Sequence, residues 1–269
     1  MLQSTVNAVR HAVHVFATQP WLILLSSLLD VLFLFVYGFV TAFPRNDLIV
    51  NGLNLASAIS QVLQTAASRY EVPTLTQVLF DPVAKPHLFG VIMWLLALFI
   101  ASFLVYVIFQ AAVWKLAGLP RKWTAHFVQF VQVNLVWLSL LGLLRVVLMI
   151  VDLRNTMAQA LTDIPASPVL HYVVLVVMAL VAYMMIISYG MLANHSWWNA
   201  IKHAIKHAFT LRVLTPCLAL LVCFALVNFS LRWVLLSSET FGVLLSAVVV
   251  FPLIYFARLY IVNAVSHVR

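Results

Sequence analysis

Charge is the scarcest feature of this sequence: only 8% of its 269 residues are Asp, Glu, Lys or Arg, against about 25% in a soluble domain. So little charge cannot cover a water-facing surface, which excludes a soluble enzyme, a soluble DNA-binding domain and a disordered chain. Hydrophobic residues make up 65% of the chain, and the mean hydropathy is +1.08. The composition therefore predicts an integral membrane protein that crosses the bilayer several times.

Cysteine is nearly absent as well, since the sequence contains only Cys217 and Cys223. Two thiols six residues apart within one apolar run face different directions on a helix, so a disulfide-rich secreted scaffold is excluded. The sequence also lacks a phosphate-binding loop, a nucleophile elbow, a zinc-protease motif and a dinucleotide-binding motif. We therefore expect neither an enzymatic activity nor a cofactor.

Six apolar runs are long enough to cross a membrane, because a helical span takes about 20 residues. They occupy residues 21–43, 88–113, 130–151, 170–192, 214–236 and 241–262. The last two are separated by only four residues, which predicts a tight antiparallel hairpin. We predict an all-α membrane bundle that forms a single membrane domain over residues 1–269. Residues 44–87 form its one sizeable external insertion, with an amphipathic helix over residues 48–70.

The charges outside the spans predict the orientation in the membrane. Segments 1–20, 114–129, 193–213 and 263–269 carry eight Lys or Arg residues and no Asp or Glu. The alternate segments carry six of the seven acidic residues. By the positive-inside rule both termini are expected to be cytoplasmic.

Two short segments resemble each other. Residues 4–13 and 196–205 are identical at five of ten positions, and each immediately precedes a span. Both are basic and amphipathic, which is typical of helices that lie in the membrane interface. We predict such helices before spans one and five, and a weaker third copy, starting at Trp123, before span three. The chain would then be an internal repeat of three units, each an interfacial helix followed by a two-span hairpin.

The polar faces of these helices carry candidates for contact with anionic lipid headgroups on the cytoplasmic side. The candidates are Arg10, His11, Lys202, His203, Lys206 and His207. The spacing of His203 and His207 would also suit a metal ion, but Lys202 and Lys206 alternate with them and no Cys, Asp or Glu is nearby. We therefore predict no metal site.

Asp30 is the one acidic residue inside a predicted span, so it must be paired, solvated or protonated. Arg145 and Arg232 are its candidate partners. In one interpretation Asp30 is a proton or cation site and the two arginines contact an anion. In the other, a Ser or Asn of the bundle binds Asp30, and both arginines extend outward toward the interface. Arg258, near the inner end of the sixth span, is also explained by such an outward extension.

A basic amphipathic helix, a span that begins near Pro-Trp, and a recurring Asn-Ala-hydrophobic-basic-His unit are found together in this chain. The residues that carry the pattern are Asn7 to Trp21 and Asn199 to Leu214. This layout resembles a group of prokaryotic six-span proteins that includes the membrane domain found beside glycerophosphodiester phosphodiesterases. The resemblance implies a six-span fold. It does not imply phosphodiesterase activity, because this chain has no catalytic phosphodiesterase domain.

Two functional hypotheses follow. In the favoured one the protein is a non-enzymatic membrane component, either a lipid-interacting scaffold or a hydrophobic subunit of a larger complex. Its partners would be anionic lipids together with membrane subunits or further copies of itself, and no nucleic acid. The alternative is a small transporter or channel that uses Asp30 with Arg145 or Arg232. An Asp30→Asn change would be silent under the first hypothesis and would abolish flux under the second.

Overall fold

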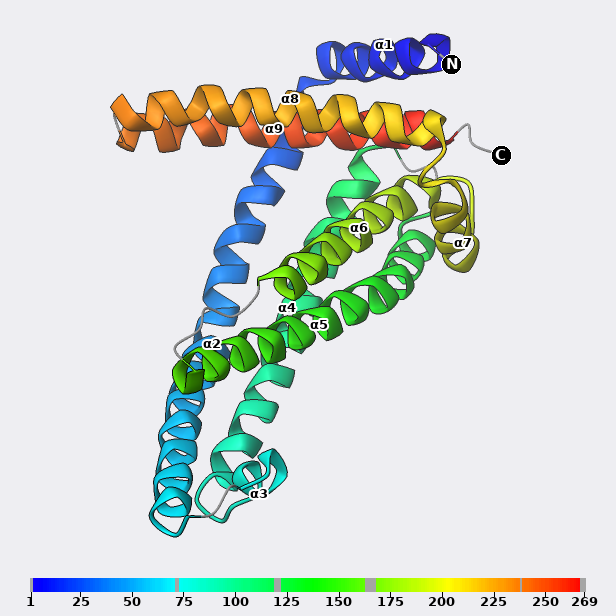
Figure 1. The fold of residues 1–269 in the computed structure, drawn as a ribbon. Helices are drawn as coiled ribbons and strands as arrows, with labels where there is room; N and C mark the ends of the chain where they lie inside the picture. Colours follow the sequence, from blue (N-terminus) through cyan, green and yellow to red (C-terminus); the bar gives the residue numbers. More distant parts are fainter. Residues whose placement is uncertain (1, 71–72, 119–121, 163–167, 238, 267–269) are drawn as a thin grey trace. The chain divides into compact units, whose positions relative to one another are not determined.

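The computed structural model describes residues 2–70, 73–118, 122–162, 168–237 and 239–266, which form helices and no strand (Figure 1). The helices are α1 (Leu2–Thr18), α2 (Pro20–Ser68), α3 (Leu75–Leu79), α4 (Lys85–Leu116), α5 (Trp123–Thr162), α6 (Val169–Met191), α7 (Trp197–His207), α8 (Leu211–Ser237) and α9 (Glu239–Ser266). Six of them, namely α2, α4, α5, α6, α8 and α9, are long and apolar enough to cross a membrane. The predicted all-α bundle with six spans is therefore confirmed, and the chain is a multi-pass membrane protein.

Two helix boundaries differ from the prediction. The span at 21–43 and the helix at 48–70 are parts of one 49-residue helix, α2, which continues through Pro44. Proline removes one backbone hydrogen bond, and here this loss does not end the helix. Residues 123–129 are the first turns of α5 and not a separate interfacial helix before span three. Separate helices do precede spans one and five, as α1 and α7.

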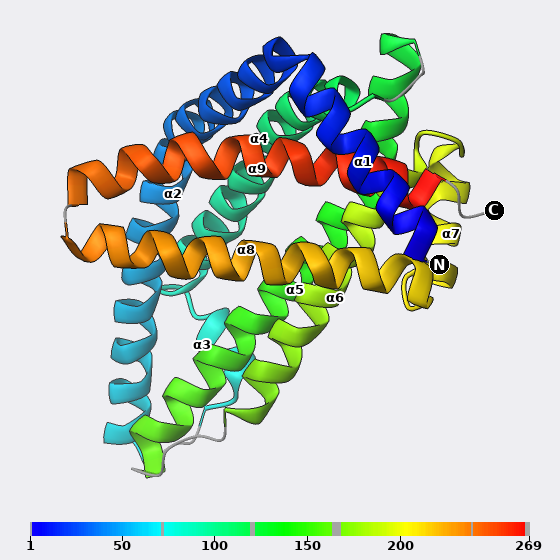
Figure 2. The same ribbon diagram turned by 90° about the horizontal axis from the view of Figure 1, so that it is seen from above.

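The chain forms two compact units. The first unit contains Met1–Val31 and Val107–Arg269, and the second contains Leu32–Tyr106. Within the first unit α8 and α9 lie side by side, which confirms the predicted hairpin, and α5 lies along α6 (Figures 1 and 2). Helix α1 packs against α9, and α7 packs against α6 and α5. Both amphipathic helices are therefore attached to spans of the same unit.

The core of the first unit contains a polar and aromatic cluster where α4 ends and α5 and α6 meet. The hydroxyl of Tyr189 donates to the side-chain oxygen of Asn134. The ring of Tyr189 lies 4.7 Å from the ring of Phe130 and 5.2 Å from that of Trp114, measured between centroids. The next residue, Gly190, allows α6 to approach α9, because a Cβ there would lie 3.1 Å from Ile261 Cγ2. These contacts fix the end of α6 from which α7 follows.

The second unit is an antiparallel pair of helical segments closed by a short folded connection. Aromatic contacts join α2 to α4, including Phe43 with Trp94, whose ring centroids are 5.2 Å apart. Beyond the pair, Thr74 caps α3 through a reciprocal capping box with Gln77. The part of residues 44–87 that the structure describes is thus folded, with small buried side chains such as Ala84 at its centre.

Candidate functional site: a buried ion pair and a basic amphipathic helix

Asp30 is held by a bidentate ion pair inside the first unit. Nη1 of Arg258 donates to Asp30 Oδ2 at 2.6 Å, and Nη2 donates to Asp30 Oδ1 at 2.9 Å. Nη2 also donates to Gln110 Oε1 at 3.0 Å, and Gln110 Nε2 donates to Asp30 Oδ1 at 3.5 Å. The side chains of Asp30 and Arg258 are only 6% and 9% exposed. This ion-pair cluster therefore neutralises a carboxylate in an apolar bundle with planar, charge-assisted hydrogen bonds.

The ion-pair cluster forms because its three residues lie at similar depths in their helices. Asp30 is ten residues after the start of α2, Gln110 is six before the end of α4, and Arg258 is eight before the end of α9. At 1.5 Å per residue these positions are about 15, 9 and 12 Å from the respective helix ends. Differences of this size are within reach of the long arginine side chain.

The predicted pairing of Asp30 with Arg145 or Arg232 is wrong. Both arginines are exposed in the structure, and Arg258 takes their place. The prediction failed because the sixth span was ended at residue 262, whereas α9 continues to Ser266 and so places Arg258 deeper than the sequence suggested. The expected Ser or Asn partner of Asp30 is also wrong, since Gln110 makes that contact.

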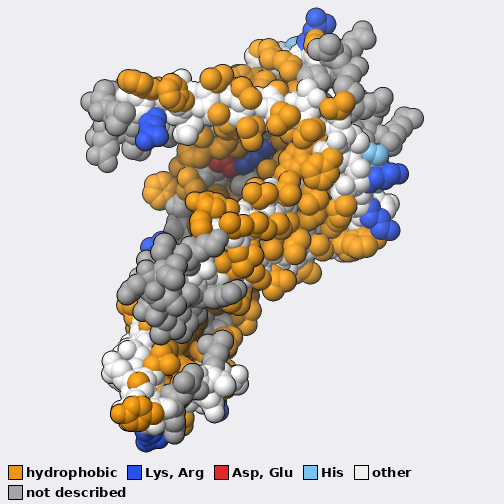
Figure 3. Space-filling model, in the orientation of Figure 1, with side chains coloured by type: hydrophobic (Ala, Val, Ile, Leu, Met, Phe, Trp, Pro, Cys, Tyr) orange, Lys and Arg blue, Asp and Glu red, His pale blue; other side chains and the backbone are white. Residues whose placement is uncertain are grey.

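Two serines near Asp30 keep unused hydrogen-bonding capacity. The hydroxyl of Ser26, one turn before Asp30 on the same stripe of α2, is fully buried and has no hydrogen-bond partner among the described residues. The hydroxyl oxygen of Ser27 is also buried and also has no hydrogen-bond partner among the described residues. In the space-filling view acidic and basic atoms lie together at the bottom of a hollow below α8 and α9 (Figure 3).

Helix α7 has three distinct faces. Its buried face packs against α6 and α5 and consists of Ala200, Ile201, Ala204 and the following Ala208. At 100° per residue, an apolar stripe comes next and consists of Trp198 and Ile205, followed by Phe209 in the turn just beyond the helix. These side chains are 47%, 54% and 61% exposed. The remaining arc is the basic face of α7, which consists of Lys202, His203, Lys206 and His207.

The three faces correct part of the sequence prediction. Helical spacing predicts that Ile201 shares one apolar face with Trp198 and Ile205, but Ile201 packs against the protein. Lys202 lies at the edge between the apolar stripe and the basic face, with its Nζ 5.3 Å from the centroid of the Trp198 ring. The end of α7 is tied to α6, because the hydroxyl of Tyr183 donates to the carbonyl oxygen of Ala208 at 2.7 Å.

His195, just before α7, and the two histidines of α7 form a stack that the sequence did not suggest. The rings of His195 and His203 are nearly parallel with centroids 4.4 Å apart, and those of His203 and His207 are 5.6 Å apart. Partial burial lowers the pKa of His207 below its ordinary 6.5, and the neighbouring Lys206 and His203 lower this pKa further. Among the described residues no group of three or more His, Cys, Asp or Glu could hold a metal ion.

Helix α1 repeats part of this arrangement. Ala8 and Ala12 are buried against α9, while Val6, Val13 and Arg10 are exposed. His11 lies on α1, but its side chain is outside the part of the chain that the structure describes.

The chain matches no protein-family model, no curated protein and no solved structure. The resemblance in layout to the six-span membrane domains therefore stays a prediction.

Proposed function

We propose that this protein is a non-enzymatic integral membrane component whose helix α7 lies in the cytoplasmic interface and binds anionic lipid headgroups. The observation that carries the proposal is the division of α7 into a protein-facing side, an exposed apolar stripe and a basic face. A helix in the interface has the protein beside it, acyl chains below it and headgroups above it, and each face of α7 suits one of these surroundings.

The chemistry of the two exposed faces supports this placement. Trp198 is an amphipathic ring of the kind enriched at the membrane surface, and it lies beside the ammonium group of Lys202. Lys202 and Lys206 would each gain about 1 kcal/mol next to an anionic leaflet. Phe209 and Ile205 are large apolar side chains that would otherwise be exposed to water.

We further infer that α1 is a second interfacial helix of the same kind as α7, as the repeat predicts. The positions that are identical in the two segments and buried in both helices are the alanines. The aligned pairs are Ala8 with Ala200, Ala12 with Ala204, Val6 with Trp198, Val13 with Ile205, and Arg10 with Lys202. In these five pairs both side chains are buried or both are exposed, whereas Val9 is 40% exposed and its counterpart Ile201 is buried. Both helices would then contact the same leaflet, on the cytoplasmic side that the charge distribution favours.

The ion-pair cluster supports a structural role for Asp30 more than a transport role. Its carboxylate already accepts three hydrogen bonds and faces a guanidinium, which cannot be deprotonated. A vacant cation site would need carboxylate oxygens that have no such counter-charge. We infer that Asp30, Gln110 and Arg258 join α2, α4 and α9 within the bundle.

The proposal is tested by measuring which lipids the full-length protein retains. The protein is placed in nanodiscs of phosphatidylcholine and phosphatidylglycerol in a 4:1 ratio, and the bound lipids are identified by native mass spectrometry. The Lys202→Gln/Lys206→Gln variant is expected to lose phosphatidylglycerol affinity by up to roughly 30-fold, since two lysines contribute about 2 kcal/mol.

The matched control is Arg45→Gln/Lys85→Gln, which removes the same charge from exposed residues of the second unit. This control should retain phosphatidylglycerol like the unchanged protein. Equal retention by both double variants and the unchanged protein would refute the proposal.

A further inference from the structure

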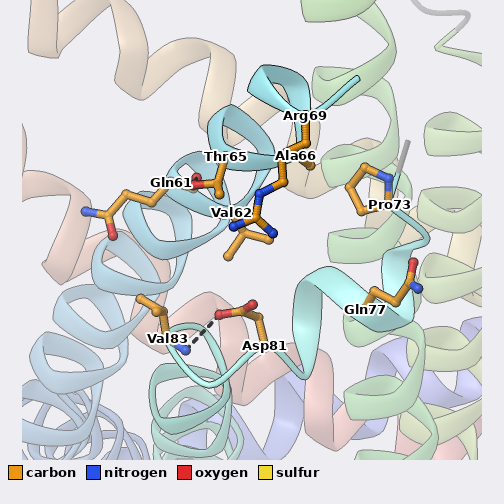
Figure 4. Close-up of a pocket in the computed structure, with 9 residues that line it drawn as sticks. All are labelled: Gln61, Val62, Thr65, Ala66, Arg69, Pro73, Gln77, Asp81 and Val83. Atoms are coloured by element: carbon orange, nitrogen blue, oxygen red, sulfur yellow. Dashed lines mark hydrogen bonds between the residues drawn. The ribbon is translucent and has the colours of Figure 1, made fainter. Parts of the chain in front are cut away.

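We propose that the second unit carries a binding pocket for a small soluble zwitterion, a molecule that holds an ammonium group and a carboxylate or phosphate on a short chain. A cavity of about 640 Å³ lies between the end of α2, α3 and the turn before α4 (Figure 4). Its volume is within the range of about 300–1,000 Å³ that is usual for small-molecule sites. This inference is independent of the lipid contact proposed for α7.

The cavity is lined by one charge of each sign. Figure 4 shows the guanidinium of Arg69, from the turn that follows α2, and the carboxylate of Asp81, from the turn before α4, facing the cavity from different sides. The two side chains form no ion pair with each other. The guanidinium of Arg69 suits a carboxylate or phosphate, and the carboxylate of Asp81 suits an ammonium group. A ligand with both groups would bridge the two charges.

The turn around Asp81 fixes the position of its carboxylate. Oδ1 of Asp81 accepts a hydrogen bond from the backbone N–H of Val83 at 2.9 Å. This bond leaves the second oxygen of the carboxylate for a ligand. An ammonium group placed there would meet an acceptor that is already oriented.

Gln77 and Gln61 also contribute to the lining of the cavity. Gln77 Oε1 accepts from the backbone N–H of Thr74 at 2.8 Å and from its hydroxyl at 3.0 Å, which holds the start of α3 at the edge of the cavity. In Figure 4 the amide ends of both side chains extend away from Arg69 and Asp81, so these two charges carry the proposed recognition.

The position of the cavity along α2 favours a soluble ligand over a lipid. The side chain of Asn51 contacts Gly90, so the apolar run of α4 begins at about the level of residue 51 of α2. Gln61 lies ten residues further along the helix, which corresponds to about 15 Å. The pocket is therefore beyond the hydrocarbon core, where its ligand would arrive from water.

The test is a binding measurement on the full-length protein in phosphatidylcholine nanodiscs. The twenty amino acids and O-phosphoethanolamine are first compared by thermal shift, and those that stabilise the protein are titrated by calorimetry. At least one zwitterion is expected to bind, and acetate or ethylammonium alone is expected to bind at least tenfold more weakly. A panel in which no zwitterion stabilises the protein would overturn the proposal.

Variants connect the binding to the pocket. Arg69→Gln and Asp81→Asn should each weaken zwitterion binding tenfold or more, and asparagine keeps the oxygen that accepts from Val83. Arg45→Gln, which removes an exposed arginine outside the cavity, should bind like the unchanged protein. Unchanged affinity in Arg69→Gln would overturn the proposal even if Asp81→Asn failed to fold. Loss of zwitterion binding in nanodiscs that contain phosphatidylethanolamine would overturn the soluble ligand in favour of a lipid headgroup.

Discussion

Asp30 and Arg258 compensate each other's charge, and the energetic effect of such a pair is asymmetric. Replacing both partners of a buried ion pair can be nearly neutral, whereas removing one leaves the other charge buried and unpaired. The side chains involved are less than one-tenth exposed, so solvent screens this effect little. A variant at Asp30 should therefore not be silent for stability.

We predict that Asp30→Asn lowers the free energy of unfolding by about 3–5 kcal/mol, because Arg258 loses its counter-charge. The double variant Asp30→Asn/Arg258→Gln should recover most of this loss. Urea or thermal unfolding of the purified protein in mild detergent gives the four free energies of the double-mutant cycle. If the two single losses simply add in the double variant, the residues do not form the pair described here.

The histidines of α7 predict a pH dependence of lipid binding. The lowered pKa of His207 keeps the ring neutral at pH 7, and protonation follows only below its ordinary value of 6.5. Because protonation adds positive charge beside Lys206, phosphatidylglycerol retention should increase as the pH falls below that value. The stability of the fold changes in the opposite direction. Because the pKa of His207 is lowered in the folded state, the free energy of unfolding decreases as the pH falls.

The check is lipid retention by native mass spectrometry on samples prepared between pH 5 and pH 8. His207→Gln should flatten the increase at low pH. His87→Gln, in the second unit, is the control and should leave the increase intact. The same pH profile in His207→Gln and the unchanged protein would mean that His207 is not the responsible group.

At the scale of helices, the attachment of α7 to α6 depends on small side chains. Ala200, Ala204 and Ala208 are fully buried, so the backbone of α7 lies close to its neighbours. The exposed stripe of α7 has no such restriction. A larger residue should therefore be tolerated on the stripe and not on the buried face.

We predict that Ala204→Leu destabilises the packing of α7 by about 1–3 kcal/mol, because a buried site has no space for the longer side chain. Hydrogen–deuterium exchange over residues 197–207 should become faster in this variant. Ile205→Leu changes the neighbouring exposed residue and should exchange like the unchanged protein. Slow exchange in Ala204→Leu would contradict the described packing.

The helices were predictable from the sequence to different extents. Apolar runs and amphipathic spacing determine where spans and interfacial helices form, so the six spans, α1 and α7 were predictable. The continuity of α2 through Pro44 was not, because a proline stops or permits a helix according to its surroundings. The burial of Ile201 also depends on the partner helix, which the sequence of α7 does not contain.

The ion-pair cluster was only partly predictable. The sequence shows that Asp30 needs a partner, since a charge within a span is costly. Which of Arg145, Arg232 and Arg258 pairs with Asp30 depends on the depth of each arginine in the bundle, to within a few residues. It also depends on which helices are neighbours of α2. Gln110 and Arg258, on α4 and α9, are 80 and 228 residues away from Asp30 in the sequence.

The whole molecule combines a multi-pass membrane bundle with two kinds of exposed polar region. The basic faces of α1 and α7 belong to the first unit, and the zwitterion pocket belongs to the second. The proposed activities are binding functions, and each can be removed by its own variants. Loss of lipid retention in Lys202→Gln/Lys206→Gln should therefore leave zwitterion binding unchanged.

The most direct test of the central claim is the depth of α7 in the bilayer. The variants Ile205→Cys, on the apolar stripe, and Asn199→Cys, on the arc of the basic face, are each made in a chain with Cys217→Ala and Cys223→Ala. Each carries a spin label, and its accessibility to oxygen and to a water-soluble relaxer is measured by electron paramagnetic resonance in anionic nanodiscs. The account predicts a label at position 205 about 5–10 Å into the headgroup–acyl boundary and a label at position 199 in water. Equal depths for the two labels, or a label at position 205 fully in water, would contradict it.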